Sequence, residues 1–341
     1  MIKKVLALIL ALTLLIAAVG CTTTPPIAAE NPEVTKAPAA PEAPAAPAEQ
    51  DDEIKVAVIL KSLTNPFWMM AKKAAEDKGA ELGVTVQVFS TTDETDFNTQ
   101  ASQVEDAVTS GFDVICLVPS DGKALVPAVE EAVAKGVPVI CLDSSIMTDK
   151  ISSFVASDNV AGGAMAADYI GEQLSGKGNV AVIRGGKGHP VELERYDGFT
   201  KQLAAKFPDI QIVTEAHADW EAAKASNVME DFLNAHPEIN AVFCESDMMV
   251  IGASQMAIGA KRTDIIFVGL DGIVDALRAV KDGKVSADVA QSPDKIGSYG
   301  VEAAVKLAKG EAIDARIVTP MVLATKDNVD PLIKAWEELG F

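Results

Sequence analysis

Histidine, cysteine and aromatic residues are all scarce in this chain of 341 residues. It has three histidines and four cysteines, and 5% of its residues are aromatic. The histidines are scattered along the sequence and no CxxC pair occurs, so no ligand set for a metal ion is apparent. We therefore expect no metal site.

Three of the cysteines stand in runs that are typical of buried strands. Cys116 and Cys141 each lie in Val-Ile-Cys-Leu, and Cys244 lies in Val-Phe-Cys-Glu. A cysteine in such a setting is usually a small, buried, apolar residue. A disulfide between Cys116 and Cys141 stays open at this point, because their strands could be neighbours in one sheet.

The motifs of nucleotide-binding and hydrolytic enzymes are missing as well. The chain contains neither a G-x-G-x-x-G nor a Walker sequence, and the glycine-rich run at 185–188 is better explained as a loop after a strand. No nucleophile elbow with an acid and a histidine in order is visible. The sequence indicates a protein that is not an enzyme and that needs no cofactor.

Positive charge is in short supply. The chain has 29 lysines and arginines against 49 aspartates and glutamates, which gives a net charge of −20. Such a field repels phosphate backbones, so we expect no nucleic-acid partner. The acidity indicates no particular ligand, since solubility alone explains it. We expect the protein to be a monomer.

No apolar run is long enough for a comfortable membrane-spanning helix, which needs ~20 residues. The apolar run at 5–19 follows two lysines and ends in small residues, as secretory signals do. The tetrapeptide Ala-Val-Gly-Cys at 18–21 resembles the bacterial lipobox, with alanine where leucine is usual. We predict that residues 1–20 are a signal peptide and that Cys21 is lipidated, which anchors an extracytoplasmic protein to the cell membrane. An ordinary cleaved signal with an incidental cysteine is the alternative.

The segment after this cysteine changes abruptly in composition. Residues 21–52 are rich in alanine and proline and show no apolar period. Such a segment cannot bury enough apolar surface to fold, and proline favours an extended chain of ~3.1 Å per residue. We interpret it as a disordered linker that lifts the folded part off the membrane.

Beyond the linker, short β-branched runs alternate with segments of helical period. Strands are expected at 54–60, 84–89, 113–118, 137–142, 179–183, 210–214, 241–244, 265–268 and 285–290. Helices are expected at segments that include 66–82, 121–135, 159–174, 190–207 and 294–309. This alternation predicts an α/β fold with parallel sheets covered by helices on both faces, and the length suggests two domains. Ligands of such sheets bind beyond the carboxyl ends of the strands.

Five short motifs at or near strand ends carry a family resemblance. They are KSLTNPFW at 61–68, ASDNVAGG at 156–163, ERYDGF at 194–199, GLDG at 269–272 and AQSPD at 290–294. Together and in this order they resemble the ribose-type periplasmic sugar-binding proteins, and the likeness extends from about residue 54 to residue 322.

The resemblance implies two similar, doubly wound, parallel-sheet lobes joined by a three-stranded hinge near Ser157, Ser292 and Met321. The lobes would comprise, in order, residues 52–156 plus 293–320 and residues 157–291 plus 321–341. A sugar would bind in the cleft between them and stabilise the closed form of the hinge. The permease of an ABC transporter would recognise that closed form.

Three aromatic residues are expected to enclose the sugar ring, because aromatic planes suit its apolar C–H faces. Phe67 and Trp68 follow the first strand, and Trp220 lies in a polar loop at an aromatic position of the family. Packing inside the protein is the structural alternative for all three.

Five polar residues are expected to bind the hydroxyl groups, since their side chains offer fixed donors and acceptors. They are Asn65, Asp143, Arg195, Asp271 and Gln291. Simpler structural roles stay open for most of them. Asn65 and the two aspartates could be helix N-caps, and Arg195 could pair with acidic neighbours at the surface.

Four positions depart from the ribose-binding relatives. Lys61 replaces a small polar residue, Ser144 an arginine, Ser246 an asparagine and Leu270 an aromatic residue. Sites built around hydroxyl groups discriminate strongly, so the loss of a guanidinium and an amide argues against ribose itself. A hexose, another pentose, a sugar alcohol, a cyclitol or a furanosyl signal molecule remains. We count Lys61, Ser144 and Ser246 among the candidate ligand contacts, although Lys61 could equally lean outward.

A ligand-binding sensor that reports its occupancy to a membrane receptor is the alternative function. Sugar-responsive transcriptional repressors share the fold, but no helix-turn-helix precedes the lobes here and a secretory signal does. The calcium loop of galactose-binding relatives is absent from the sequence.

Overall fold

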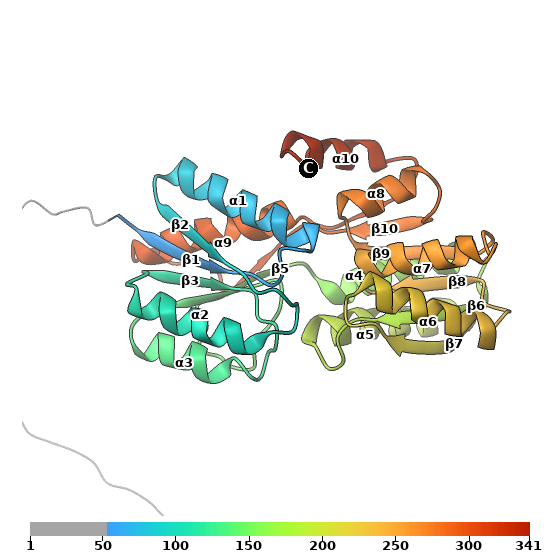
Figure 1. Cartoon of the computed structure of the whole chain (residues 1–341), viewed down its shortest axis with the longest axis horizontal. Coiled ribbons are helices and arrows are strands. Elements are labelled where there is room, and N and C mark those ends of the chain that lie inside the picture. Colours follow the sequence, from blue (N-terminus) through green and yellow to red (C-terminus); the bar gives the residue numbers. More distant parts are fainter. Residues whose placement is uncertain (1–52) are drawn as a thin grey trace, which may run out of the picture. The chain divides into compact units, whose positions relative to one another are not determined.

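The computed structural model describes residues 53–341, so the predicted signal peptide, Cys21 and the linker lie outside the described residues. The described chain forms two α/β lobes, each built on a six-stranded sheet (Figure 1). We call the lobe that contains β1 the first lobe and the lobe that contains β6 the second. Within residues 53–341, no helix is both long and apolar enough to cross a membrane.

The first lobe has an entirely parallel sheet in the order β11-β5-β4-β3-β1-β2. Its strands are β1 (Lys55–Ile59), β2 (Thr85–Phe89), β3 (Val114–Leu117), β4 (Val139–Leu142), β5 (Ser153–Ala156) and β11 (Arg316–Val318). Its helices are α1 (Pro66–Leu82), α2 (Phe97–Thr109), α3 (Val126–Ala134) and α9 (Pro293–Ala308). Alternate strand residues face opposite sides. Val56 and Val58 therefore pack with α1 and α9, whereas Ala57 and Ile59 pack with α2 and α3.

The second lobe repeats this plan in the order β12-β10-β9-β8-β6-β7, with only β12 antiparallel to its neighbour. Its strands are β6 (Lys177–Arg184), β7 (Asp209–His217), β8 (Ala241–Cys244), β9 (Ile266–Asp271), β10 (Ala287–Ala290) and β12 (Val322–Ala324). Its helices are α4 (Asn159–Gln173), α5 (Pro190–Lys206), α6 (Ala222–Ala235), α7 (Asp247–Gly259), α8 (Val274–Lys281) and α10 (Val329–Glu338). Val180 and Val182 pack with α4 and α5, whereas Ala181 and Ile183 face the core of the other four helices.

The two lobes are joined where the chain passes from one sheet to the other. The crossings are residues 157–158, 291–292 and 319–321. They are tied to each other, because Ser157 Oγ lies 2.9 Å from Thr319 Oγ1 and Ser292 Oγ donates to the Pro320 carbonyl over 3.1 Å. The three segments therefore form one hydrogen-bonded hinge.

The cysteine pair does not form a disulfide. Cys116 and Cys141 are free and buried. They lie on neighbouring strands, but Cys116 is opposite Ile140 and Cys141 is opposite Leu117. This offset of one residue turns the two thiols to opposite faces of the sheet, where they join different cores.

One expected helix is shorter than the sequence pattern suggested. The helix predicted at 121–135 begins at Val126 instead. The carboxylate of Asp121 accepts hydrogen bonds from the backbone N–H groups of Lys123 and Ala124, both over 2.7 Å. An aspartate turn of this kind competes with the first helical turn and delays the helix.

Candidate ligand-binding site

A cavity lies between the two lobes, beyond the carboxyl ends of their strands. Each lobe contributes six of the residues that line it. They are Lys61, Asn65, Phe67, Trp68, Glu94 and Asp143 from the first lobe, and His189, Val191, Arg195, Trp220, Ser246 and Asp271 from the second. The cavity volume is about 30 Å³, within about 380 Å³ of space between the lining atoms that includes the part open to solvent. A ligand there would touch both lobes at once.

The first aromatic pair is set by the start of α1. Asn65 caps this helix by accepting the backbone N–H of Phe67 over 3.0 Å, and Pro66 occupies the first helical position. The Phe67 and Trp68 rings meet edge to face, 4.8 Å apart at 82°. Both rings are buried and line the cavity. Asn65 lines the cavity as well, so it serves both as a helix cap and as a lining residue.

Trp220 faces this pair from the second lobe in an uncommon backbone conformation. Asp219 and Trp220 have φ values of 49° and 67°. The indole lies against Gly185, where a β-carbon would overlap the ring. The His189 ring lies 5.8 Å away at 82°, and the Arg195 guanidinium lies 5.9 Å from the indole centroid. Strained backbone of this kind is most common at functional sites, where surrounding contacts hold it.

Lys61 points into the cavity, which settles its orientation. Its side chain is 5% exposed, and Nζ lies 3.3 Å from Ser144 Oγ, 3.4 Å from His189 Nε2 and 5.3 Å from the Trp68 ring. His189 Nδ1 accepts the Val191 N–H over 3.3 Å, so the neutral ring carries its proton on Nε2. The ammonium therefore donates to Ser144 but not to His189, and part of its donor capacity faces the cavity.

The acceptor beside Lys61 is Asp143. Ser144 Oγ donates to Asp143 Oδ2 over 2.8 Å. Asp143 is buried at the end of β4 with a φ of 59°, and no helix follows for it to cap. Ser144 itself does not line the cavity and instead supports Asp143 and Lys61 from behind.

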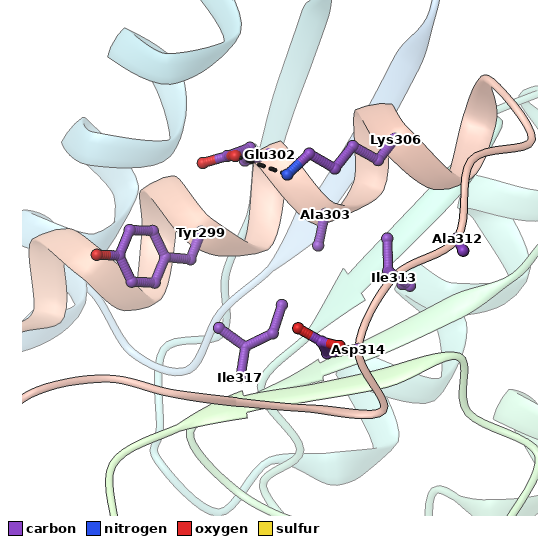
Figure 2. Close-up of a pocket in the computed structure, with 8 residues that line it drawn as sticks. All are labelled: Tyr299, Glu302, Ala303, Lys306, Ala312, Ile313, Asp314 and Ile317. Atoms are coloured by element: carbon purple, nitrogen blue, oxygen red, sulfur yellow. Dashed lines mark hydrogen bonds and ion pairs between the residues drawn. The ribbon is translucent and has the colours of Figure 1, made fainter.

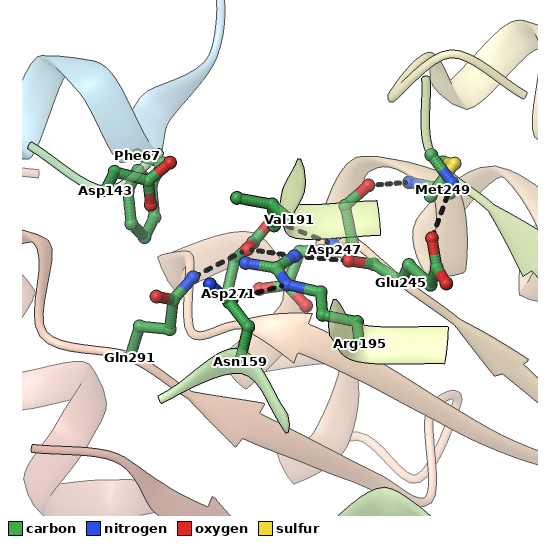
Figure 3. Close-up of polar contacts among 12 residues, drawn as sticks. Phe67, Asp143, Asn159, Val191, Arg195, Glu245, Asp247, Met249, Asp271 and Gln291 are labelled. Atoms are coloured by element: carbon green, nitrogen blue, oxygen red, sulfur yellow. Dashed lines mark hydrogen bonds and ion pairs between the residues drawn. The ribbon is translucent and has the colours of Figure 1, made fainter. Parts of the chain in front are cut away.

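Arg195 and Asp271 form a buried ion pair at the wall of the second lobe (Figure 3). Arg195 Nη1 lies 3.0 Å from Asp271 Oδ1 and also donates to the Glu245 carbonyl, while Nε donates to Asn159 Oδ1 over 3.0 Å. Gln291 donates to Asp271 Oδ1 over 3.0 Å without lining the cavity. Arg195 is thus no surface residue, and Asp271 does not cap the following helix, since α8 has Ile273 at its N-cap.

The carboxylates of the cavity are held in a dry setting. Burial raises the pKa of Asp271 to about 7, although the Arg195 guanidinium opposes the shift. Burial likewise raises the pKa of Glu94 to about 7, against the positive charge of Lys61. The pKa of His189 lies well below its usual value because the ring is buried and Lys61 is close. The last polar candidate, Ser246, caps α7 through the Met249 N–H over 3.5 Å.

Comparison with known proteins places this geometry in a family. Residues 56–312 match the family model described as a periplasmic binding protein domain. The ribose import binding protein RbsB of Bacillus subtilis (strain 168) is 35% identical over 274 residues, which cover 80% of this chain and 88% of that protein. The D-allose-binding periplasmic protein of Escherichia coli (strain K12) is 36% identical over 262 residues, or 74% of this chain and 84% of that protein. The chain belongs to the ribose-type periplasmic sugar-binding family.

A solved structure agrees with this membership. A carbohydrate transporter solute binding protein from Agrobacterium radiobacter, in complex with D-arabinose, matches with a TM-score of 0.79 at 32% identity. The match covers 84% of this chain and 99% of that one. The predicted fold class, two doubly wound lobes of the type I periplasmic binding proteins, is confirmed. The family consists of sugar-binding transport proteins rather than enzymes, and it indicates an extracytoplasmic location.

Sequence motifs did not reveal three lining residues of this binding protein. Glu94, His189 and Val191 all lie outside the five motifs. Glu94 accepts the Trp68 indole N–H, with oxygens at 2.9 and 3.1 Å, and an Asn65 amide hydrogen over 3.4 Å. Its position in the loop after β2 was the available sign, since that loop also follows a strand's carboxyl end.

A second hollow lies in the first lobe between α9 and β11 (Figure 2). One lobe alone forms it, and its main polar feature is the exposed pair of Glu302 and Lys306, 2.9 Å apart. Such a pair is already satisfied in water and contributes little. The hollow therefore lacks the convergent, desolvated polar groups that distinguish the interlobe cavity.

Proposed function

We propose that this protein is the solute-binding lipoprotein of an ABC importer and that it captures a monosaccharide or a related polyol by closing its lobes around it. The observation that carries the proposal is the cavity itself, to which each lobe contributes six lining residues. A ligand that bridges both walls stabilises the closed arrangement by its differential contacts. In our proposal the closing units are residues 52–156 with 293–320 and residues 157–291 with 321–341.

The lining suits a hydroxylated ring. Phe67 and Trp68 on one side and Trp220 on the other offer apolar surfaces for the two ring faces. Asp143 offers buried acceptor oxygens to ligand hydroxyls, and Lys61 offers donor hydrogens. The first lobe thus offers a donor and an acceptor next to the aromatic rings.

The identity of the ligand is proposed only as a class. The relatives compared above are named for ribose and D-allose, and the solved structure holds D-arabinose. Ser144 and Ser246 stand where ribose-binding relatives carry an arginine and an asparagine, which favours another sugar or a polyol over ribose.

Delivery and anchoring complete the proposal. The permease of the importer would recognise the closed face, and lipid on Cys21 would hold the protein at the outer side of the cell membrane. Several acyl chains give durable anchoring where a single chain gives marginal binding. Mass spectrometry of the N-terminal peptide from the membrane fraction tests the anchor, and an unmodified Cys21 there would refute it.

A thermal-shift screen tests the ligand class. Residues 22–341, unfolded and refolded to remove any carried ligand, would be heated with pentoses, hexoses, sugar alcohols, cyclitols, nucleosides and amino acids. A ligand at 100 times its Kd stabilises the folded state by about 2.7 kcal/mol, which moves the melting point by several degrees. We expect a shift with one monosaccharide or polyol. A shift only with a nucleoside or an amino acid would overturn the assignment.

A further inference from the structure

Two buried aspartates lie directly behind the Asp271 segment. Asp247 is the first residue of α7, next to Ser246 at the cavity wall, and Asp288 lies within β10. Both are 0% exposed. Neither lines the cavity, and ligand contact explains neither carboxyl group.

The two side chains converge over Gly269, the β9 residue that pairs with Asp288. A β-carbon at Gly269 would lie 2.7 Å from Asp247 Oδ1 and 2.7 Å from Asp288 Oδ2. Because Gly269 has no side chain, both oxygens can occupy the space next to it. Asp247 Oδ1 and both Asp288 oxygens have no hydrogen-bond partner of normal geometry within residues 53–341, although the Gly272 N–H approaches both carboxyl groups. The two carboxyl groups are therefore each other's natural partners.

The remaining oxygen of Asp247 holds the segment that carries Asp271. Oδ2 accepts the Ile273 N–H over 2.7 Å, and the Asp247 N–H lies 3.4 Å from Asp271 Oδ2. Figure 3 shows Asp247 next to Asp271. Asp271 has a costly backbone conformation, with a φ of 152°, and Gly272 follows it with a φ of 82° that glycine adopts freely. Outside contacts must hold such a conformation, and Asp247 supplies two of them.

The pair has no counter-charge of its own. The charged or titratable groups around it are Asp271 on β9, Arg195 on α5 and Cys244 on β8, and Arg195 is already paired with Asp271. Two ionised carboxylates in a dry site repel each other strongly, and a single shared proton removes the conflict. In agreement, burial and the neighbouring carboxyl raise the pKa of Asp247 well above its usual range, and burial raises that of Asp288 to about 6.

We propose that Asp247 and Asp288 share one proton and that this pair positions residues 271–273 for ligand binding. The proton lies between Asp247 Oδ1 and Asp288, which leaves Asp247 Oδ2 free to accept the Ile273 N–H. Its loss puts two charges next to Asp271, drives the carboxylates apart and releases the segment. The positioning role rests on the proposed function, because it assumes that the cavity binds its ligand through Asp271.

The variant Asp288→Asn tests this most directly, because its amide donates a hydrogen bond to Asp247 without a titratable proton. Isothermal titration calorimetry would give Kd values for D-ribose, D-allose and D-arabinose between pH 6 and pH 10. Asp271 and Glu94, whose pKa values are about 7, titrate in this range in both proteins. We therefore expect the wild-type Kd to rise at least ~10-fold more than the variant's Kd, because only the wild type also loses the shared proton. Asp282→Asn, at an exposed residue paired with Lys284, should follow the wild type. Superimposable profiles of wild type and Asp288→Asn would overturn the proposal.

Thermal unfolding without sugar separates this proposal from the ligand assignment. A shared proton gives a folded-state pKa above the ordinary aspartate value of ~3.9, so its stabilising effect is lost as the pH rises from there through the folded pKa. Between pH 5 and pH 9 the melting point of the wild type should therefore fall more than that of Asp288→Asn. If the melting points differ in this way but calorimetry detects no binding of any sugar, the shared proton is supported and the positioning role is refuted. Equal melting points at every pH would overturn both, and Asp247→Asn repeats the test if the first variant does not fold.

Discussion

Buried charge is the main feature of the individual residues around the cavity. Burial raises the pKa of Asp271 and of Glu94 to about 7, and that of Glu245, behind Arg195, to about 8. Loss of hydration is the largest cause in each case. These residues tie the stability of the protein to pH.

Glu245 provides the clearest pH prediction. Its raised pKa means that its stabilising contribution is complete below the unfolded value of ~4.3 and is lost as the pH rises through about 8. The free energy of unfolding should fall across that window, by up to about 1.4 kcal/mol per pH unit from this group. Glu245→Gln, whose amide oxygen can still accept the Gly185 N–H, should show a flatter profile in urea unfolding. The exposed Glu230→Gln is the control, and matching slopes for Glu245→Gln and wild type would contradict the prediction.

Trp220 provides the clearest binding prediction. Trp220→Ala removes the aromatic surface of the second lobe and should raise the Kd for the cognate sugar about 10- to 100-fold, or about 1.4–2.8 kcal/mol. The fold should survive, because the side chain is only half-buried. Tyr299→Ala removes an aromatic residue from the other hollow and should leave the Kd unchanged in the same calorimetric titration. Equal affinities of Trp220→Ala and the wild type would remove Trp220 from the site.

At the scale of elements, the position of α5 decides where Arg195 lies. Helices α4 and α5 cross so closely that a β-carbon at Gly163 would collide with the Arg195 carbonyl. A β-carbon at Gly198 would likewise collide with the Val160 carbonyl. Two glycines thus set the distance between the helices, and through it the reach of the guanidinium.

A methyl group at this crossing should affect stability and binding together. Gly163→Ala should lower the free energy of unfolding by about 1–3 kcal/mol, because the backbones must separate, and should weaken sugar binding by moving Arg195. Gly259→Ala is the matched control, since nothing lies within 4 Å of its β-carbon. That control should be neutral or slightly stabilising. A neutral Gly163→Ala in urea unfolding would show that the crossing has room to spare.

The sequence was sufficient to predict an element where the residues that begin and end it can be recognised locally. The helix expected at 66–82 is observed at Pro66–Leu82, because Asn65 and Pro66 start it and Gly83, with a φ of 69°, ends it. The strands β5, β11 and β12 were not expected, since three or four residues are too few for a period and their pairing depends on the tertiary structure. The helix expected at 121–135 failed because the Asp121 turn was not recognised.

The site was predictable where its residues lie in the five motifs or at positions just after expected strands, such as Asp143, Trp220 and Ser246. Nine of the eleven candidate ligand contacts line the cavity, while Ser144 and Gln291 support lining residues from behind. Their contact with a ligand remains a prediction. The sequence could not predict the direction of a side chain, and Lys61, which points into the cavity, is the main example. Glu94, which accepts the Trp68 indole N–H, and His189, which lies beside Lys61, could not be predicted. They reach the cavity only in the folded protein, where the loop after β2 and the start of α5 lie on opposite sides of it.

At the scale of the whole molecule, the proposed capture of a ligand requires the lobes to move. In the structure they meet across the cavity, where Lys61 of the first lobe lies 3.4 Å from His189 of the second. These two groups do not hydrogen-bond each other, so a ligand that contacts both walls should add to the contacts between the lobes. Hinge closure should therefore depend on occupancy.

Small-angle X-ray scattering tests this dependence. The radius of gyration of residues 22–341 should decrease when the cognate sugar is added at saturation, because the hinge closes. Trp220→Ala at the same sugar concentration should show a smaller decrease. A radius that is identical with and without bound sugar would mean that binding does not require closure.

The most direct measurement is a crystal structure with the sugar or polyol that the thermal-shift screen identifies. The account predicts its ring between Trp220 and the pair of Phe67 and Trp68, with hydroxyl groups bonded to Asp143 in one lobe and to Arg195 or Asp271 in the other. A ligand bound to one lobe alone, or seated outside the interlobe cavity, would contradict the central claim.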